Sequence, residues 1–169
     1  VRVVTLDDYY LPPELCPRVE LEPLPWPNGQ VPEAFLRRGC QDTNSPAATD
    51  WPRVMDAITS ARMAAADARE PAVLIEGLCL FADHPGAAAI RNLCQHHTLL
   101  TAAVDDEQAC HALRQRKWAR AHLGKPSYEE RGVSQAQYRV WFDEYVWPSW
   151  VKHSTATPSR LLRLDCLQP

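Results

Sequence analysis

The sequence predicts an α/β fold in which a parallel sheet is flanked by helices. Short apolar runs recur at Val1–Leu6, Ala72–Ile75 and His97–Val104, and such runs are typical of strands that are buried on both faces. Segments with helical spacing of apolar residues lie between them. Strands that alternate with helices form parallel sheets through right-handed crossovers, and ligands bind beyond the carboxyl ends of such strands.

The first strand is followed by a pair of carboxylates and then by a long loop. Val1–Leu6 is short and β-branched, and it ends at Asp7 and Asp8. An Asp pair at this place either caps a turn or carries chemistry, and the local sequence leaves both open. Leu11–Val31 is rich in proline and contains Asn28-Gly29, which predicts an irregular loop with a turn. Its length favours a functional loop over a simple connection.

The next helix and strand are marked by local signals. Thr49 or Asp50 is expected to cap a helix that has Pro52 in its first turn. An apolar stripe at helical spacing follows, formed by Val54, Ile58, Ala61 and Ala65. The strand Ala72–Ile75 then ends at Glu76-Gly77.

The second half of the chain repeats the pattern. A strand is expected at His97–Val104, and Asp105 and Asp106 start a helix that Gly124, Lys125 and Pro126 end. Ser134 begins another helix, with Gln137 at the capping-box position, and this helix continues through Tyr138–His153. The run Arg160–Asp165 predicts a last strand.

The composition is that of one globular domain over residues 1–169. Hydrophobic residues make up 46% and charged residues 23% of the chain, which is enough for a sizeable core. The net charge of −3 and the pI of about 6.1 give no basic footprint for nucleic acid. There is neither a signal segment nor an apolar run near the roughly 20 residues that span a bilayer. We therefore expect a cytoplasmic protein with no nucleic-acid or membrane partner.

The six cysteines are scattered, and no two form a C-x-x-C pair. This pattern predicts reduced thiols instead of a disulfide framework. Cys94, His96 and His97 lie close together, but no second cluster has the spacing of metal ligands. We therefore expect no metal site at this stretch.

Two strands that each end in a carboxylate suggest a site at one edge of the sheet. If the strands are neighbours, Asp7 and Glu76 converge there, where carboxylates can hold Mg²⁺ or take a proton. The helix after the third strand carries Arg116 and Arg120, which are four residues apart and share one helix face. Carboxylates opposed by arginines suit phosphoryl transfer, although an arginine run can also be simply a solvated helix face.

The order of these segments resembles the nicotinamide riboside kinases, a nucleoside-kinase branch of the P-loop kinases. The segment "TLDDYYLPPE" resembles that family's strand with two acidic and two aromatic residues, and "VLIEGLCLF" resembles its second strand. "NGQ" with "TNSPAATDW" resembles the family's substrate segment, and "LRQRKWAR" resembles its lid helix. "WFDEYVWPSWVKH" resembles the segment after the lid, and "LLRLD" resembles the C-terminal strand. The resemblance covers most of the chain and implies a P-loop kinase-like sheet.

The resemblance also implies roles for individual residues. Asp7 matches the base that takes the proton of the ribose 5′-hydroxyl. Glu76 matches the acidic residue that works with Mg²⁺, and Asp7 would be the second residue that holds the metal. The implied lid spans about residues 105–135. Its arginines, Arg116 and Arg120, would contact the phosphates of ATP. The implied contacts to the substrate are Asp8, Asp42, Asn44 and Asp143.

One position departs from the family's pattern. Asn44 occupies the place where the family usually has an aspartate that holds the ribose hydroxyls. Asparagine can accept a hydrogen bond but carries no charge. Asp42 could take over this role only if the register of the segment slips.

The phosphate-binding loop of the family is not among the 169 residues. No G-x-x-x-x-G-K-(S/T) segment occurs at any of the six glycines. We therefore expect a kinase-like chain that lacks the first strand, this loop and the first helix and is truncated at both ends, and that is inactive by itself. Two alternatives are a non-catalytic module that binds nucleosides or a partner protein, and a kinase for uridine or another small alcohol.

Overall fold

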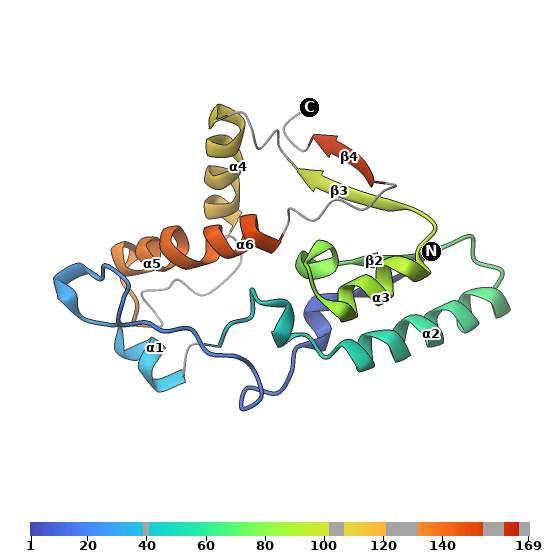
Figure 1. Ribbon diagram of the computed structural model, residues 1–169, viewed down its shortest axis with the longest axis horizontal. Helices are drawn as coiled ribbons and strands as arrows, with labels where there is room; N and C mark the ends of the chain where they lie inside the picture. Colours follow the sequence, from blue (N-terminus) through green and yellow to red (C-terminus); the bar gives the residue numbers. More distant parts are fainter. Residues whose placement is uncertain (39–40, 102–106, 121–131, 154–160, 166–169) are drawn as a thin grey trace. The chain divides into compact units, whose positions relative to one another are not determined.

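The computed structural model describes all residues except 39–40, 102–106, 121–131, 154–160 and 166–169. The chain divides into two compact units (Figure 1). The first unit comprises Val1–Val19, Cys40–Cys94 and Ser149–Ala156, and the second comprises Glu20–Gly39, Gln95–Pro148 and Thr157–Pro169. Each unit contains helices and one pair of parallel strands, so the fold is mixed α/β, as the sequence predicts.

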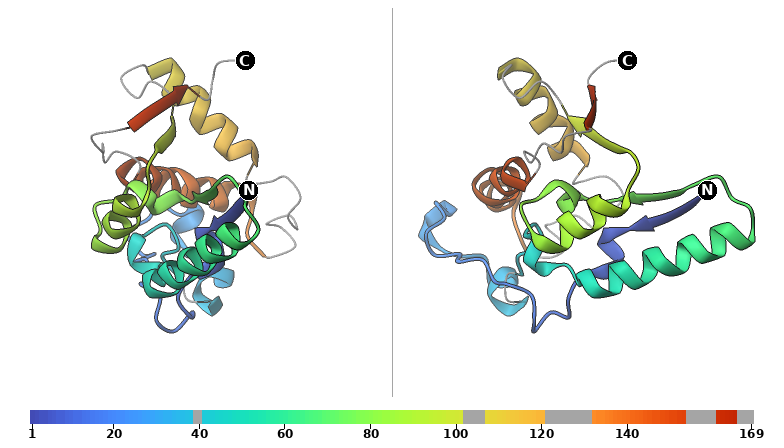
Figure 2. Two further views of the ribbon diagram at one scale, coloured as in Figure 1. Left: turned by 90° about the vertical axis from the view of Figure 1, so that its right-hand side faces the viewer. Right: turned by 45° about the vertical axis from the view of Figure 1, so that its right-hand side comes forward.

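The first unit is built on two neighbouring parallel strands. β1 (Arg2–Thr5) pairs with β2 (Val73–Glu76), and Thr5 lies opposite Glu76 in the register. This pairing confirms the prediction that the first two apolar runs are adjacent parallel strands. The connecting helix α2 (Trp51–Asp67) lies along both strands (Figures 1 and 2).

Helix α2 begins where the sequence predicts. The side chain of Asp50 accepts a hydrogen bond of 3.2 Å from the backbone N–H of Arg53, so Asp50 is the N-cap. Pro52 lies in the first turn, where its missing N–H leaves no hydrogen bond unmade. Of the expected apolar stripe, Val54, Ile58 and Ala65 are buried and Ala61 is partly buried against the core.

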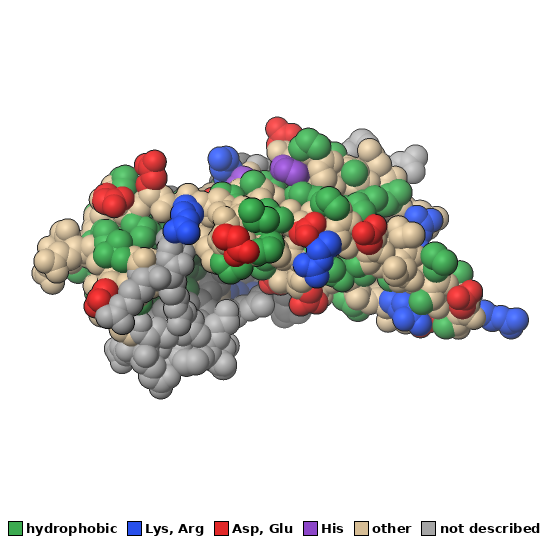
Figure 3. Space-filling model, turned by 90° about the horizontal axis from the view of Figure 1, so that it is seen from below, with side chains coloured by type: hydrophobic (Ala, Val, Ile, Leu, Met, Phe, Trp, Pro, Cys, Tyr) green, Lys and Arg blue, Asp and Glu red, His purple; other side chains and the backbone are tan. Residues whose placement is uncertain are grey.

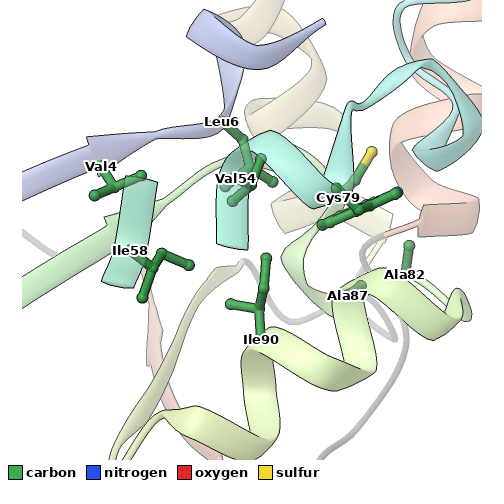
Figure 4. Close-up of a cluster of buried hydrophobic side chains, with 9 residues drawn as sticks. Val4, Leu6, Val54, Ile58, Cys79, Ala82, Ala87 and Ile90 are labelled. Atoms are coloured by element: carbon green, nitrogen blue, oxygen red, sulfur yellow. The ribbon is translucent and has the colours of Figure 1, made fainter. Parts of the chain in front are cut away.

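The core of the first unit lies between α2, the strands and a further helix, α3 (Pro85–Leu93), which the sequence analysis did not anticipate. The largest side chains that are fully buried there are Val54, Ile58 and Ile90, and Figure 4 shows them packed with Val4 and Leu6. Each such aliphatic side chain contributes about 1.5–3 kcal/mol on burial. This core fixes the positions of the loops that follow β1 and β2.

Only one face of the β1–β2 pair is covered among the described residues. Val4 is 5% exposed, whereas Val3 is 57% exposed and its partner Leu74 is 53% exposed. The prediction that these strands are buried on both faces is therefore wrong for this pair. Successive side chains of a strand point to opposite faces, and α2 and α3 pack on one face only.

In the second unit, β3 (His97–Thr101) pairs in parallel with β4 (Leu161–Asp165). The last strand is thus confirmed within one residue of its expected start. The sequence predicts one parallel sheet, but the strands of the described residues form two separate pairs, so the expectation of a single sheet is wrong there.

Two further helices lie where the lid helix and the segment after it are expected. α4 (Glu107–Arg120) contains the arginines of the expected lid helix, whereas its predicted start at Asp105-Asp106 and end at Gly124–Pro126 lie outside the described residues. α5 (Gln135–Trp141) begins with the predicted capping box, in which Ser134 Oγ accepts from the Gln137 N–H at 3.2 Å and Gln137 Oε1 accepts from the Ser134 N–H at 2.9 Å.

The helix after α5 changes its winding before a proline. A π-helical segment, Phe142–Val146, joins α5 to α6 (Trp147–His153). The N–H of Trp147 bonds to the carbonyl of Phe142, five residues back. Pro148 has no N–H and its ring crowds the carbonyl four residues earlier, so a local widening of the helix accommodates it. The predicted helical stretch through Tyr138–His153 is confirmed.

The proline-rich loop has the expected turn. The N–H of Gly29 bonds to the carbonyl of Trp26 at 2.9 Å, and Asn28 adopts a left-handed conformation with φ of 63°. A short helix that the sequence analysis did not anticipate, α1 (Glu33–Arg38), follows the loop.

The surface of the described residues carries charges of both signs. On the face drawn in Figure 3, acidic and basic side chains are interspersed among hydrophobic ones. Among the helices of the described residues, none has the length and apolar character that crossing a bilayer requires.

Candidate functional site

Two carboxylates lie at the same edge of the β1–β2 pair, as the sequence predicts. Because Thr5 is opposite Glu76, the chain delivers Glu76 at the end of β2 and Asp7 two residues beyond the end of β1. Both side chains are exposed, and so is that of Asp8. We refer to this region, with the loop around Asp42 and Asn44 described below, as the strand-edge site.

The two loops that leave the strands approach each other closely at Gly77. A Cβ atom on Gly77 would lie 2.5 Å from the Cβ atom of Leu6, which is less than any normal contact between carbon atoms. Leu6 is 3% exposed and belongs to the core. Glycine at position 77 therefore allows the backbone next to Glu76 to pack against the residue that precedes Asp7. The sequence analysis gave Gly77 no role, although its place directly after Glu76 was the available signal.

The chain after β1 forms a short 3₁₀ helix, Leu6–Tyr9, that ends at Tyr10. In a 3₁₀ helix, side chains three residues apart lie above one another. The hydroxyl of Tyr10 accordingly donates a hydrogen bond of 3.2 Å to Oδ1 of Asp7. Sequence analysis missed this contact, because it noted the two aromatic residues without considering the three-residue spacing.

The backbone around Tyr10 is fixed to the segment that starts α2. Tyr10 forms an antiparallel bridge with Thr49, and the N–H of Leu11 bonds to the carbonyl of Ala48 at 2.8 Å. The N–H of Asp50 in turn bonds to the carbonyl of Tyr9 at 2.7 Å. The residues that follow Asp7 are thus tied to the end of the segment that contains Asp42 and Asn44.

The segment with Asp42 and Asn44 contacts both strand loops of the first unit. The N–H of Asp42 bonds to the carbonyl of Pro17 at 2.7 Å, and its carbonyl accepts from the N–H of Ser45 at 3.2 Å. The backbone carbonyl of Asn44 accepts from the thiol of Cys79, with a distance of 3.8 Å from Sγ to the oxygen. Since Cys79 lies two residues beyond Gly77, this contact links Asn44 to the loop that follows Glu76. Both Asp42 and Asn44 are partly buried.

Burial and the carboxylates of the strand-edge site raise the pKa of two side chains, Cys79 and Tyr10. Burial raises the pKa of the Cys79 thiol to about 12, and the carboxylates of Asp42 and Asp7 act in the same direction. Burial, followed by the negative charge of Asp7, raises the pKa of the Tyr10 phenol. The charges of Asp7 and Asp42 therefore both act on Cys79.

Two other groups of the first unit are affected by Asp42. Burial raises the pKa of Cys16, and the charges of Glu14 and Asp42 add to this effect. Burial lowers the pKa of His153, as does the nearby Lys152, whereas Asp42 opposes both. The field of Asp42 thus reaches the C-terminal turn of α6.

The carboxylates of the strand-edge site fit Mg²⁺ only as part of a larger set of ligands. In the described part of the chain, no three side chains of His, Cys, Asp or Glu gather in a way that could hold a metal ion. Mg²⁺ usually takes one or two carboxylates from a protein and fills its other positions with water and substrate phosphates. Asp7 and Glu76 are a pair of the type that this coordination needs.

The other predicted site residues belong to the second unit. Asp143, in the π-helical segment, is paired with two arginines: Oδ1 lies 2.8 Å from a terminal guanidinium nitrogen of Arg114, and Oδ2 lies 2.6 Å from Nε of Arg139. Arg114 is on α4, so Asp143 links α4 to the helical segment that contains Asp143. Arg116 is exposed on α4, and the side chain of Arg120 lies outside the described residues. The predicted roles of these three residues stay predictions.

An aromatic cluster surrounds this charged group. The guanidinium carbon of Arg139 lies 4.7 Å from the ring centroid of Trp118. Trp118 also stacks on Tyr138 and meets Phe142 edge-on, with centroid distances of 5.3 and 5.2 Å. No sequence pattern grouped Arg114 and Trp118 of α4 with Arg139 of α5, because the two helices meet only in the folded chain.

Comparison with known proteins adds no assignment. No protein-family model matches the chain, and no curated protein is significantly similar to it. The functional argument therefore depends on the residues of the two units and on their geometry.

Proposed function

We propose that this chain is the acceptor-binding and lid portion of a ribonucleoside kinase of the nicotinamide riboside kinase type, which acts in the cytoplasm. The observation that carries the proposal is the pairing of β1 with β2. It brings the carboxylates that follow the two strands to one edge, in the order that the family resemblance implies. The resemblance of the segments along the chain gives independent support.

In this proposal the strand-edge site binds and activates the nucleoside. Asp7 takes the proton of the 5′-hydroxyl, and Glu76 with Asp7 holds Mg²⁺. The ribose hydroxyls face the segment of Asp42 and Asn44, and Asp8 makes a further contact to the substrate. Mg²⁺, when bound, would neutralise charge on the phosphates of ATP. For the residues of the second unit, the family resemblance implies a substrate contact for Asp143 and phosphate contacts for Arg116 and Arg120.

Two other functions are alternatives to this proposal. One is a module that binds nucleosides or a partner protein without catalysis. A kinase for uridine or another small alcohol is favoured by Asn44, which replaces a charged ribose contact with a neutral one.

The first experiment separates these functions by binding and turnover. Calorimetry with nicotinamide riboside, uridine and glycerol shows which alcohol the 169-residue chain binds. Phosphorylation is then measured for the chain alone and for the chain joined to an N-terminal strand, loop and helix with the G-x-x-x-x-G-K-(S/T) sequence. We expect nicotinamide riboside to bind, and only the joined protein to phosphorylate it. Binding without turnover in either protein supports the non-catalytic module, and no binding of any alcohol contradicts all three functions.

The second experiment tests the assignment of the base. Asp7→Asn in the joined protein keeps the size of the side chain but cannot accept the proton, so we expect kcat to fall by about 10²–10⁴-fold with little change in KM. Asp8→Asn is the matched variant and should reduce kcat much less, because adjacent side chains point in different directions. Equal losses would mean that the pair acts as a shared metal site or a turn. A larger loss for Asp8→Asn would assign the base to Asp8.

A further inference from the structure

We propose that Tyr10 is a positioning residue for Asp7: its hydroxyl holds Oδ1 of the carboxylate and leaves Oδ2 to face the hydroxyl of the substrate. The inference rests on the proposed function, in which Asp7 is the base. It starts from the hydrogen bond of 3.2 Å between the Tyr10 hydroxyl and Oδ1 of Asp7.

The local fold makes this contact a built feature of the site. The 3₁₀ helix Leu6–Tyr9 places position 10 over position 7. The bridge to Thr49 and the hydrogen bond from the Leu11 N–H to the Ala48 carbonyl fix the backbone on both sides of the Tyr10 side chain. Tyr10 therefore does not need to be ordered by a ligand before it can hold Asp7.

The neighbouring tyrosine has different surroundings. The guanidinium carbon of Arg53 lies 5.7 Å from the ring centroid of Tyr9, and Tyr9 packs against the core of the first unit. Its contacts are thus made by the ring, whereas Tyr10 reaches Asp7 with its hydroxyl. Tyr9→Phe and Tyr10→Phe each remove one oxygen atom, so they form a matched pair.

The chemistry of the two groups suits a hydrogen bond in which the Tyr10 phenol donates and the Asp7 carboxylate accepts. Burial, with the charge of Asp7, raises the pKa of the Tyr10 phenol, so the phenol is a donor at neutral pH. An ionised carboxylate accepts hydrogen bonds at both oxygens, and a bond to a charged acceptor is stronger than one between neutral groups. With Oδ1 held, the carboxylate is kept in one orientation, and Oδ2 remains available.

The transfer step is balanced without any proton from Tyr10. The O–H bond of the nucleoside 5′-hydroxyl breaks and its proton passes to Oδ2 of Asp7. The hydroxyl oxygen forms a bond to the γ-phosphorus of ATP, and the bond from that phosphorus to the bridging oxygen breaks with release of ADP. The phenolic O–H of Tyr10 stays intact throughout.

The contact itself is tested in the 169-residue chain by NMR, with ¹³C at Cζ of the tyrosines. The Tyr10 signal is identified by its loss in Tyr10→Phe. We expect its chemical shift at neutral pH to change in Asp7→Asn, which removes the charged acceptor of the hydrogen bond, but not in Asp8→Asn. A Tyr10 signal that does not respond to Asp7→Asn, or responds equally to Asp8→Asn, overturns the proposal.

The role in transfer is tested in the joined protein described above. We expect Tyr10→Phe to lower kcat by about ten- to a hundredfold, with the KM for the nucleoside changed by less than about twofold. A loss of kcat without a loss of nucleoside affinity is the result that a positioning role predicts and a general loss of structure does not. Tyr9→Phe should leave kcat and KM as they are.

The outcomes distinguish this inference from the proposed function. If the joined protein is active but Tyr10→Phe retains its kcat, the role of Tyr10 is overturned and the kinase function stands. The same conclusion follows if Tyr9→Phe and Tyr10→Phe lower kcat equally. If the joined protein phosphorylates no alcohol, the proposed function fails, and the role of Tyr10 fails with it even where the NMR coupling to Asp7 is observed.

Discussion

Gly77 packs directly against Leu6, and a methyl group at position 77 would come within 2.5 Å of the Cβ atom of Leu6. Leu6 follows β1 and Gly77 follows β2, so this approach joins the loops that carry the two carboxylates of the strand-edge site. Because Leu6 is 3% exposed, it has no free space into which it can retreat. The position of Glu76 relative to Asp7 thus depends on a residue without a side chain.

Gly77→Ala should therefore destabilise the first unit. Overpacking of this kind typically costs about 1–3 kcal/mol, and the positive φ of 159° at Gly77 adds a backbone penalty. Urea unfolding followed by circular dichroism gives the change in the free energy of unfolding. Gly132→Ala is the matched control, since Gly132 also has a positive φ, of 72°, but no atom lies within 4 Å of the added carbon. Equal losses in the two variants would mean that the backbone conformation, and not the contact with Leu6, accounts for the cost.

The ribose contact can be tested by exchanging an amide and a carboxylate. Asn44→Asp restores the charged acceptor of the family's pattern, and the contact of Asn44 with Cys79 is made by the backbone, so the exchange leaves it in place. We expect nicotinamide riboside to bind about 5- to 30-fold more tightly, as measured by calorimetry, because one neutral hydrogen bond becomes charge-assisted.

Asp42→Asn is the companion variant for this exchange. If it weakens binding while Asn44→Asp has no effect, Asp42 is the residue that holds the ribose. If neither change alters the affinity, the segment does not contact the sugar, and the preference for a ribonucleoside loses its main support.

The ion pairs of Asp143 predict a cost in stability for the second unit. Asp143→Asn leaves Arg114 and Arg139 without their shared carboxylate, and both arginines are only about one third exposed. We expect the free energy of unfolding to fall by about 1–3 kcal/mol in urea. Arg114→Gln should cost less, because Asp143 keeps its bond to Arg139. A stability of Asp143→Asn equal to that of the wild type would mean that the two ion pairs contribute nothing measurable to folding.

The buried thiol of Cys79 predicts a loss of stability at alkaline pH. Its pKa is raised from 9.0 to about 12, so folding favours the protonated thiol. This contribution to stability is complete below pH 9 and decreases as the pH rises from about 9 to 12. Relative to Cys79→Ala, the free energy of unfolding of the wild type should fall by at most about 1.4 kcal/mol per pH unit in this window. Parallel pH profiles for the two proteins, measured by urea unfolding, would contradict a buried protonated thiol. Cys110→Ala, which removes a thiol from α4, is the control variant for this pH profile.

The elements that sequence analysis identified correctly are those with signals in neighbouring residues. β1 and β2 are short apolar runs, the N-cap of α2 is an aspartate directly before a proline-containing first turn, and α5 starts with a capping box. These signals act through hydrogen bonds and side-chain packing over three or four residues. By contrast, α1 has only six residues. The helix α3 has Pro85 in its first turn, but its N-cap is His84, whose Nδ1 accepts from the N–H of Gly86, and histidine is not among the residues usual at that position.

The sequence by itself determined the strands β1 and β2, the carboxylates that follow them, and the helices α2 and α5, because each is specified by residues close together in the chain. Only the tertiary structure decided that β3 pairs with β4, that the carbonyl of Asn44 meets Cys79 across 35 positions, and that Asp143 joins two arginines from different helices. Such contacts depend on how the segments pack, and no local pattern of residues encodes that. Even the bond between Tyr10 and Asp7, three positions apart, needed the structure, since it exists only because the chain winds as a 3₁₀ helix there.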